Sequence, residues 1–165
     1  MYEIERRFLI SSYPTNEVES LPVVNILQTY LAGTGDWTIR SRYAVSDKAD
    51  AVGQATLTMK QRVSHGKSIE IEDHVQKQVY DQMAFLAGSE IVKDRIKIPH
   101  GKHTIEFDCF RNPELNDLMI AEVELSSIDE EFEIPAWFGR EVTGESKYSN
   151  HNLFKHLQRL NQHKK

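Results

Sequence analysis

Charged residues separated by a single position recur along the whole chain. The acidic members are Glu3 and Glu5, Glu70 and Glu72, Glu106 and Asp108, and Glu122 and Glu124. The basic members are Arg7, Arg40 and Arg42, Lys60 and Arg62, and Lys93, Arg95 and Lys97. Carboxylates gathered in one place can hold a divalent cation, and guanidinium and ammonium groups can hold phosphate oxygens. These side chains therefore suit phosphoryl transfer, provided that the fold brings them to one surface.

Apolar residues alternate with these charges, and this period of two predicts the elements that position them. In a β-strand, residues at i and i+2 share a face. We expect eight strands, over about residues 2–10, 24–31, 37–43, 55–63, 67–75, 90–98, 103–110 and 118–126. Short turns at 65–66 and 100–102 predict antiparallel neighbours. Seven of the eight strands carry paired charges on one face and mainly apolar residues on the other.

Two helices are expected beside the strands. The first covers about residues 75–87 and ends at Gly88, and the second begins near Asn150, a residue type that caps helices well. The expected inward faces carry Val75, Val79, Met83 and Leu86 in the first helix, and Leu153, Phe154, Leu157 and Leu160 in the second. Because the helices interrupt the strands instead of alternating with them, the pattern is not that of a βαβ fold.

The charged faces allow two interpretations. They could be the solvated side of an ordinary antiparallel sheet, and for any single pair this is the better explanation. The whole set favours the other interpretation, because the positions are almost exclusively charged and separate by strand into acidic and basic groups. We therefore expect an α+β fold, predominantly β, in one domain over residues 1–165. It forms an eight-stranded antiparallel β-barrel, with the charges inside a tunnel and a few flanking helices.

Composition narrows the class of protein. A net charge of −5 argues against general nucleic-acid binding, and no apolar stretch is long enough to span a membrane. The charged start of the chain lacks the apolar run of a signal peptide, so we expect a cytoplasmic protein. The single cysteine, Cys109, agrees with a reducing compartment and is expected in the core. The seven histidines lie mainly in turns or the second helix, and surface roles are expected for them.

Motifs of other phosphate-binding and metal-binding classes are missing from the sequence. It has no GxxxxGK[ST] loop, no GxGxxG after a strand, and no HExxH or paired CxxC. No GxSxG supports a Ser/His/Asp arrangement.

The segment EIERRFLI, with Glu3, Glu5 and Arg7, resembles the ExExK signature of the CYTH superfamily, the triphosphate tunnel metalloenzymes. Further motifs follow in the order of that family, from QTYL at Gln28 and the Arg40/Arg42 pair to the charged pairs of the later strands. The segment IPAWFGREVTGESKYSNHNL at 134–153 is similar to the PxWxGxEVT…Y.N..L close of small bacterial members. The resemblance covers nearly the whole chain.

The resemblance implies a tunnel that binds a triphosphate with one or two divalent cations, Mg²⁺ or Mn²⁺. The implied metal ligands are Glu3, Glu5, Glu122 and Glu124. The implied phosphate-binding residues are Arg7, Arg40, Arg42, Lys60, Arg62, Lys93, Arg95 and Lys147. Supporting roles fall to Glu70, Glu72, Glu106 and Asp108, and catalytic roles to Glu5, Lys93 and Glu122.

Two positions depart from the family pattern. Arg7 stands where the signature has lysine, which keeps the charge but changes its reach and geometry. Ser68 stands where small bacterial relatives commonly carry an arginine, and Lys67 beside it is expected to point to the opposite face of a regular strand. One phosphate contact is therefore expected to be missing.

Hydrolysis of tripolyphosphate to pyrophosphate and phosphate is the leading interpretation of function. A class IV adenylyl cyclase and a thiamine triphosphatase are alternatives, because members of the same family carry out these reactions. From a different class, the protein could be a non-catalytic polyphosphate or nucleotide binder, although four carboxylates would not help an anion to bind without a metal. A structural β-protein with a salt-bridged face is the remaining alternative. The expected ligand is a small-molecule triphosphate.

An inward charged face leaves an apolar face outside. The apolar rows on this outer face end in Ile39, Met59, Ile71, Ile96, Phe107 and Val123. Two helices can cover only part of such a surface, and exposed apolar patches commonly mark an interface. We therefore expect a homodimer, unless loops such as 44–54 and 127–147 fold back over the barrel.

Overall fold

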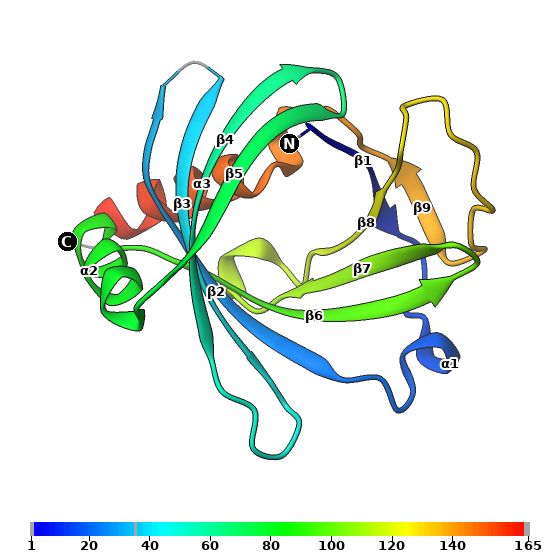
Figure 1. Cartoon of the computed structure of the whole chain (residues 1–165), viewed down its shortest axis with the longest axis horizontal. Helices are drawn as coiled ribbons and strands as arrows, with labels where there is room; N and C mark the ends of the chain where they lie inside the picture. Colours follow the sequence, from blue (N-terminus) through cyan, green and yellow to red (C-terminus); the bar gives the residue numbers. More distant parts are fainter. Residues whose placement is uncertain (1, 35, 164–165) are drawn as a thin grey trace.

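The computed structural model describes residues 2–34 and 36–163 and shows a closed antiparallel barrel (Figure 1). Its strands are β1 (Tyr2–Ile10), β2 (Val23–Thr34), β3 (Trp37–Ser46), β4 (Gln54–Ser64), β5 (Lys67–Val75), β6 (Ile91–His100), β7 (His103–Phe110), β8 (Met119–Glu124) and β9 (Phe138–Glu141). Neighbours follow the order β5-β4-β3-β2-β6-β7-β8-β1, and pairing of Tyr2 with Ile69 closes the ring. The prediction of an eight-stranded barrel, α+β and mainly β, is confirmed, with β9 as an added strand beside β1.

The register of the strands places the charged rows inside the barrel. Glu5 lies directly opposite Glu124, and Arg7 lies opposite Glu122, across the β1–β8 ladder. Arg95 and Asp108 face each other in the same way between β6 and β7. Because facing residues share one side of the sheet, the pairs form a continuous inner layer. Only β2 lacks a charge at these inward positions, which Gln28 and Tyr30 occupy instead.

An apolar core outside the barrel covers the strands β1, β6, β7 and β8. It joins Phe8, Ile96, Phe107 and Val123 to Trp137 and Phe138 of the segment that follows β8. The short helix α1 (Thr15–Val18) contributes Val18 to the same cluster. Figure 1 shows α1 and the segment leading to β9 on this side of the barrel. Three of the six apolar rows expected outside are thus covered by the chain itself, which was the alternative to a dimer.

A second apolar core closes one end of the barrel. Leu153, Phe154 and Leu157 of α3 (Asn150–Gln162) pack there, as predicted, while Leu160 is half-buried. Their partners are Tyr30, Ile91, Phe110, Leu115 and Ile120. Ile91, Phe110 and Ile120 continue the inward rows of β6, β7 and β8, so the interior changes from charged to apolar at this end. The helix N-cap is Ser149, not Asn150, because the Ser149 hydroxyl accepts a hydrogen bond from the Asn152 N–H.

Helix α2 (Lys77–Ala87) packs on the outside of the barrel with a face that matches the predicted one only in part. Met83 is buried as predicted, together with Tyr80, whereas Val79 and Leu86 are 39% and 70% exposed. The Tyr80 ring lies 6.1 Å from that of Tyr43, and its hydroxyl donates to Glu90, which fixes the rotation of the helix. Gly88 ends the helix in the left-handed conformation, as predicted.

The outer face of β3, β4 and β5 remains uncovered in part. Met59 and Ile71 lie directly opposite each other there and are 42% and 61% exposed. Trp37 on β3 is exposed on the same face. None of the helices in the described ranges 2–34 and 36–163 is both long and apolar enough to cross a membrane.

Candidate active site

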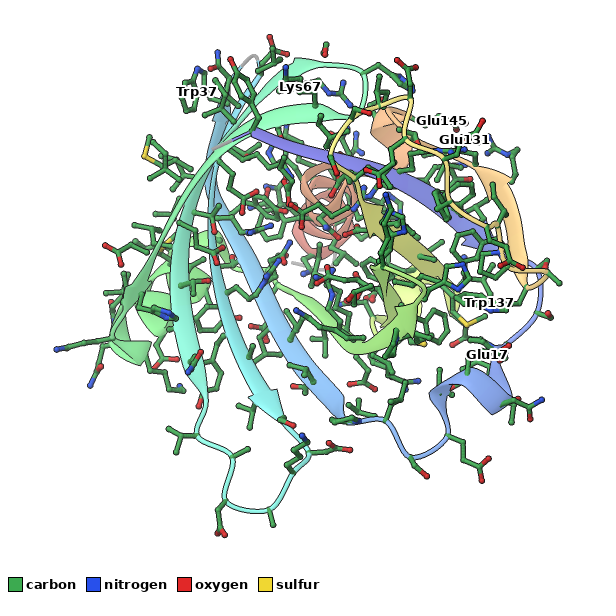
Figure 2. The ribbon with its side chains drawn as sticks, turned by 45° about the vertical axis from the view of Figure 1, so that its right-hand side comes forward. Glu17, Trp37, Lys67, Glu131, Trp137 and Glu145 are labelled. Atoms are coloured by element: carbon green, nitrogen blue, oxygen red, sulfur yellow. The ribbon has the colours of Figure 1, made fainter. Side chains whose placement is uncertain are left out.

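The barrel encloses a cavity of about 750 Å³ lined almost entirely by charged side chains. Twelve of the expected site residues line it: Glu3, Glu5, Arg7, Arg40, Arg42, Lys60, Glu70, Glu72, Arg95, Glu106, Glu122 and Glu124. A smaller cavity of about 390 Å³ adjoins it and also contains Arg62. Both cavities contact Glu5, Arg7, Arg40, Lys60 and Asn150, so they adjoin each other at these side chains. Figure 2 shows side chains from several strands filling the interior of the barrel.

Three residues of the expected site do not line either cavity. Lys93 and Asp108 are fully buried behind the wall, where the Lys93 Nζ lies 2.5 Å from Asp108 Oδ2. Lys147 is exposed, and its Nζ lies 5.4 Å from the centre of the Tyr148 ring. Strand alternation correctly places Lys93 on the inward face of β6. At this position, however, the strand lies beside the apolar core that packs against α3, and this core buries it.

Arg7 is held by two elements. Its Nε donates to Glu122 Oε1 at 2.9 Å, and its Nη1 donates to the Tyr148 carbonyl at 2.8 Å. The second partner lies in the 3₁₀ helix η2 (Ser146–Tyr148), directly before α3. A guanidinium fork can reach both acceptors at once, whereas an ammonium group is a single point of charge. The arginine at this position therefore ties the segment before α3 to the barrel wall.

Asp108 organises the basic groups of β6. It accepts from Arg95 Nε at 2.6 Å and from Arg95 Nη2 at 2.7 Å, in addition to Lys93. Burial lowers the pKa of Lys93 to about 8, against the opposing effect of Asp108. Burial also raises the pKa of Asp108, but Arg95 and Lys93 more than offset this and hold it below its ordinary value. Asp108 is thus a buried anion that fixes the Arg95 fork toward the larger cavity.

Arg40 and Arg42 on β3 differ in how far the protein satisfies their charges. Arg40 Nη2 lies 3.1 Å from Thr58 Oγ1, 3.3 Å from Glu72 and 3.5 Å from Glu70, but the buried Arg40 Nε has no hydrogen-bond partner within the described part of the chain. Arg42 donates only to Gln28 Oε1, at 3.4 Å, and no carboxylate of the described residues lies within 4 Å of it. Burial, Arg40 and Arg95 lower the pKa of Arg42 to about 10. A buried cation without a counterion favours an anionic ligand.

Some acidic residues of the cavity lie close to other negative charges. Burial and Glu122 raise the pKa of Glu5 above its ordinary value, and burial and Glu3 do the same for Glu124. Residues 2–34 and 36–163 contain no group of three acidic, imidazole or thiol side chains already arranged to hold a metal ion. The donor set nevertheless fits a hard divalent cation, because Glu5 and Glu124 are crowded oxygen ligands that repel each other. Glu122 is instead occupied by Arg7 and Arg95, and Glu3 by Lys60.

The two departures from the family pattern can now be located. Ser68 is buried, lines the smaller cavity, and donates from its hydroxyl to Glu3 Oε2 at 3.4 Å. Lys67 also lines the smaller cavity, and its Nζ lies 4.1 Å from the centre of the Tyr2 ring. Lys67 nevertheless pairs with Ile4 and shares the outward face of Tyr2, as expected for a regular strand, so it borders the smaller cavity only from the edge of the barrel. The shift in register beside the turn at Gly66 lies on β4, between Arg62 and Ser64, and leaves the pairing of β5 with β1 regular.

Several residues that line the cavities were not predicted from the sequence. Glu130 lies within 2.6 Å of Lys102 and 2.9 Å of His103, and all three border the larger cavity. We expected the histidines on the surface, but His103 is partly buried and borders the cavity. Period-two alternation could not reveal this group, because Glu130 lies in a loop and Lys102 in a turn. Asn150 was considered only as a helix cap, yet it borders both cavities.

Solved structures share this barrel. A putative adenylyl cyclase from Hippeastrum, described as having a dominant triphosphatase activity, superimposes with a TM-score of 0.54 at 14% identity, covering 76% of this chain and 80% of the other. PH1819 from Pyrococcus horikoshii gives 0.56 at 18% identity, covering 77% and 80%. Together with the inward charges, these likenesses define the fold as that of the triphosphate tunnel proteins.

Sequence comparison is more specific. No family model matches the chain. An inorganic triphosphatase from Nitrosomonas europaea is 33% identical over 160 residues, covering 93% of this chain and 97% of the relative. An inorganic triphosphatase from Acetivibrio thermocellus is 31% identical over 155 residues, covering 93% of both. The chain belongs to the inorganic triphosphatase family, within the CYTH superfamily.

Proposed function

We propose that this protein hydrolyses inorganic tripolyphosphate to pyrophosphate and orthophosphate with the help of a divalent cation. The observation that carries the proposal is that one barrel holds two opposed carboxylates, Glu5 and Glu124, and a half-buried guanidinium without a described counterion, that of Arg42. The carboxylates attract a cation, and Arg42 attracts an anion. A linear triphosphate bound together with a metal ion satisfies both, and the inorganic triphosphatase relatives support the assignment.

In this proposal, Arg40 and Arg42 receive the substrate. Both lie on the inward face of β3, and Arg40 offers an unpaired Nε–H in addition to its charge. Lys60 and Arg95 also border the cavity, but their ion pairs, at 2.5 Å and 2.6 Å, are shorter than the 3.3 Å and 3.5 Å contacts of Arg40. Phosphate oxygens would therefore replace part of those contacts. The substrate binds to two guanidinium groups first and then shares the remaining cations with Glu3, Glu106 and Glu122.

Glu5 and Glu124, with Glu3 beside them, are the side chains proposed to hold Mg²⁺ or Mn²⁺. When bound, the ion supplies positive charge at phosphate oxygens and lowers the pKa of a coordinated water. We assign Glu122 to positioning, because its two oxygens contact Arg7 and Arg95 and keep both guanidinium groups at the wall. Lys93 acts indirectly, because it contacts Asp108, and Asp108 in turn fixes the position of Arg95.

Hydrolysis breaks one phosphoanhydride bond. The oxygen of water bonds to a terminal phosphorus, and the bridging oxygen leaves with pyrophosphate. Negative charge grows on the oxygens around the reacting phosphorus, where fixed guanidinium groups stabilise it without reorganisation of solvent. Arg40 and Arg42 are proposed to supply this stabilisation, because Arg40 is buried, Arg42 is half-buried and both border the larger cavity.

A class IV adenylyl cyclase and a thiamine triphosphatase would use the same phosphate contacts, but also need a pocket for an organic group. The wall of the larger cavity is polar, with Lys102, Thr104 and Glu130, and among its lining residues only His103 carries a ring, whereas Tyr30 and His151 line the smaller cavity. A phosphate-release panel separates these functions. Tripolyphosphate, ATP, GTP and thiamine triphosphate are each supplied with Mg²⁺ or Mn²⁺, and the proposal expects the highest kcat/KM for tripolyphosphate. Binding without release would support the non-catalytic alternative.

Partners and assembly follow from the surface. We propose a small-molecule substrate and neither nucleic acid nor membrane as a partner, in keeping with the net charge of −5. A homodimer is proposed to cover the apolar face around Met59 and Ile71, which the chain leaves exposed. A cytoplasmic location is proposed because Cys109 is a buried free thiol, as expected in a reducing compartment.

A further inference from the structure

The two cavities reach the surface through rims of different charge. The smaller cavity has a rim with Arg62, Lys67 and Lys155, which we call the basic mouth. The larger cavity has a rim with Lys97, Lys102, Glu106, Glu124 and Glu130, which we call the acidic mouth. Because both cavities share Arg7, Arg40 and Lys60, either mouth leads to the same phosphate-binding side chains.

The lysines of the acidic mouth are neutralised. Lys97 Nζ lies 3.3 Å from Glu106, and Lys102 Nζ lies 2.6 Å from Glu130. Glu124 adds a further carboxylate to this rim, and no cation of the described residues lies within 4 Å of it. A polyanion that approaches this mouth in the metal-free protein meets compensated cations and at least one uncompensated carboxylate. Without a bound metal ion, the field there therefore opposes an incoming triphosphate.

The cations of the basic mouth are not neutralised. Arg62 contacts only the Gly144 carbonyl, at 3.3 Å, and Lys67 lies over the Tyr2 ring. Within the described part of the chain, no carboxylate lies within 4 Å of Arg62, Lys67 or Lys155. The acidic residues of the same cavity rim are Asp36 and Glu145, and Glu145 is paired with Arg140. Three free cations thus face one free carboxylate.

These cations come from three separate elements that meet at one end of the barrel. Arg62 is near the end of β4, Lys67 begins β5, and Lys155 lies on α3. Lys67 and Glu145, which both border the smaller cavity, lie at the same end of the barrel in Figure 2. From this rim, Lys60 and Arg40 continue the series of cations into the larger cavity. A negatively charged chain would find a positive group at each step.

We propose that the basic mouth is the entrance for the anionic substrate, and that Lys67 and Lys155 capture it there. The inference rests on the proposed function, because it concerns the route to the same site. It assigns a role to two residues that lie outside the set expected to bind phosphate. Lys67 thereby supplies, at the entrance, positive charge near the position where Ser68 replaces an arginine.

Neutralising each mouth in turn tests the proposal. The entrance variant combines Lys67→Gln with Lys155→Gln, and the matched control combines Lys97→Gln with Lys102→Gln. At low ionic strength, the entrance variant should lose about tenfold in kcat/KM for tripolyphosphate while kcat stays unchanged, and the loss should shrink as salt is added. The control should change by less than about twofold. Equal losses in both variants, or no loss in the entrance variant, would overturn the proposal.

Blocking each mouth gives a second test that does not depend on charge. Lys155→Cys and Lys102→Cys place a thiol at the basic and the acidic mouth, and each is labelled with a bulky maleimide polymer. Cys109 gives little background, because it is buried and burial raises its pKa to about 11. The label at position 155 should stop turnover of tripolyphosphate, whereas the label at position 102 should leave most of the activity. Inhibition by the second label alone, or by both, would contradict an entrance at the basic mouth.

Failure of the proposed function has a different signature. A wild-type protein that releases no phosphate from tripolyphosphate would refute the hydrolase assignment before any variant is compared. The wild type, the entrance variant and the matched control would then be compared by the rate at which they bind tripolyphosphate. Slower binding only in the protein altered at positions 67 and 155 would still support the entrance, and unchanged binding would overturn it.

Discussion

Glu5 and Glu124 lie directly opposite each other on β1 and β8, although both are acidic. Like charges at facing positions of an antiparallel ladder destabilise a sheet. The pKa of each is raised, first by burial and then by a neighbouring carboxylate, which shows that the free protein disfavours their ionised forms. A divalent cation between these strands would remove the repulsion. The arrangement is therefore unfavourable for folding alone and favourable for binding a metal.

Replacing Glu124 by glutamine should separate these two effects. Glu124→Gln removes a metal-binding charge and a repulsion, so phosphate release should fall by orders of magnitude while the thermal midpoint without metal stays level or rises. Initial rates and thermal melts check both outcomes. Glu17→Gln on the exposed helix α1 is the matched control and should change neither quantity. Near wild-type turnover in Glu124→Gln would show that this carboxylate does not hold the metal.

The acid limb of the pH profile should lie above the ordinary pKa of glutamate, 4.5. Glu5 and Glu124 take up protons at higher pH than free glutamates do, and protonated carboxyls bind metal poorly. Activity should therefore fall as pH decreases through their raised pKa values, and more metal should move this limb to lower pH. For these two groups the folded state binds protons more readily than the unfolded state, so their protonation stabilises the metal-free fold. A limb that does not respond to metal concentration would contradict the assignment.

Arg42 should be more important for binding than for folding. Arg42→Gln removes a buried cation that lacks a described carboxylate partner, so the unliganded thermal midpoint should stay level or rise. Loss of a charge-assisted contact should raise KM for tripolyphosphate by about tenfold or more. Tripolyphosphate with metal should also stabilise the variant less than the wild type. Arg159→Gln, on the exposed side of α3, serves as the control. Equal ligand-induced shifts in all three proteins would exclude Arg42 from the site.

The inward-facing charges could be predicted from the sequence, because side chains alternate between the two faces of a strand with a fixed period. Glu5, Arg7 and Glu122 could be assigned to one face without knowledge of their partners. No sequence pattern marks how far along the barrel axis a side chain lies. Lys93 and Arg95 share a face of β6, yet only Arg95 reaches the cavity, because the core closed by α3 begins beside Lys93.

Contacts made by irregular segments were also beyond prediction. The Tyr148 carbonyl that receives Arg7 is a backbone group, which no residue type marks. Phe132 and Trp137 cover the outer face of β1 and β7 from a segment with few regular elements. The predicted fold was therefore correct, whereas the extent of the exposed apolar surface was overestimated.

That remaining surface makes a prediction about assembly. If two copies pair through the face around Met59 and Ile71, the mass in solution should be twice the 19.1 kDa chain mass. The Ile71→Glu variant places a charge on this exposed face and should shift the mass toward the monomer with little effect on folding. Light scattering across a dilution series measures both. A wild-type mass near 19.1 kDa at micromolar concentration would refute the dimer.

We propose that the opposed carboxylates, together with Arg40 and with Arg42, which lacks a carboxylate partner among the described residues, form a metal-dependent triphosphatase site. The most direct test is phosphate release from tripolyphosphate by the wild-type protein, measured with Mg²⁺ or Mn²⁺, with excess EDTA, and after the metal is restored. We predict one orthophosphate and one pyrophosphate per tripolyphosphate with metal, no release with EDTA, and full recovery when the cation is returned. Undiminished release in EDTA, or no release with either metal, would contradict the claim.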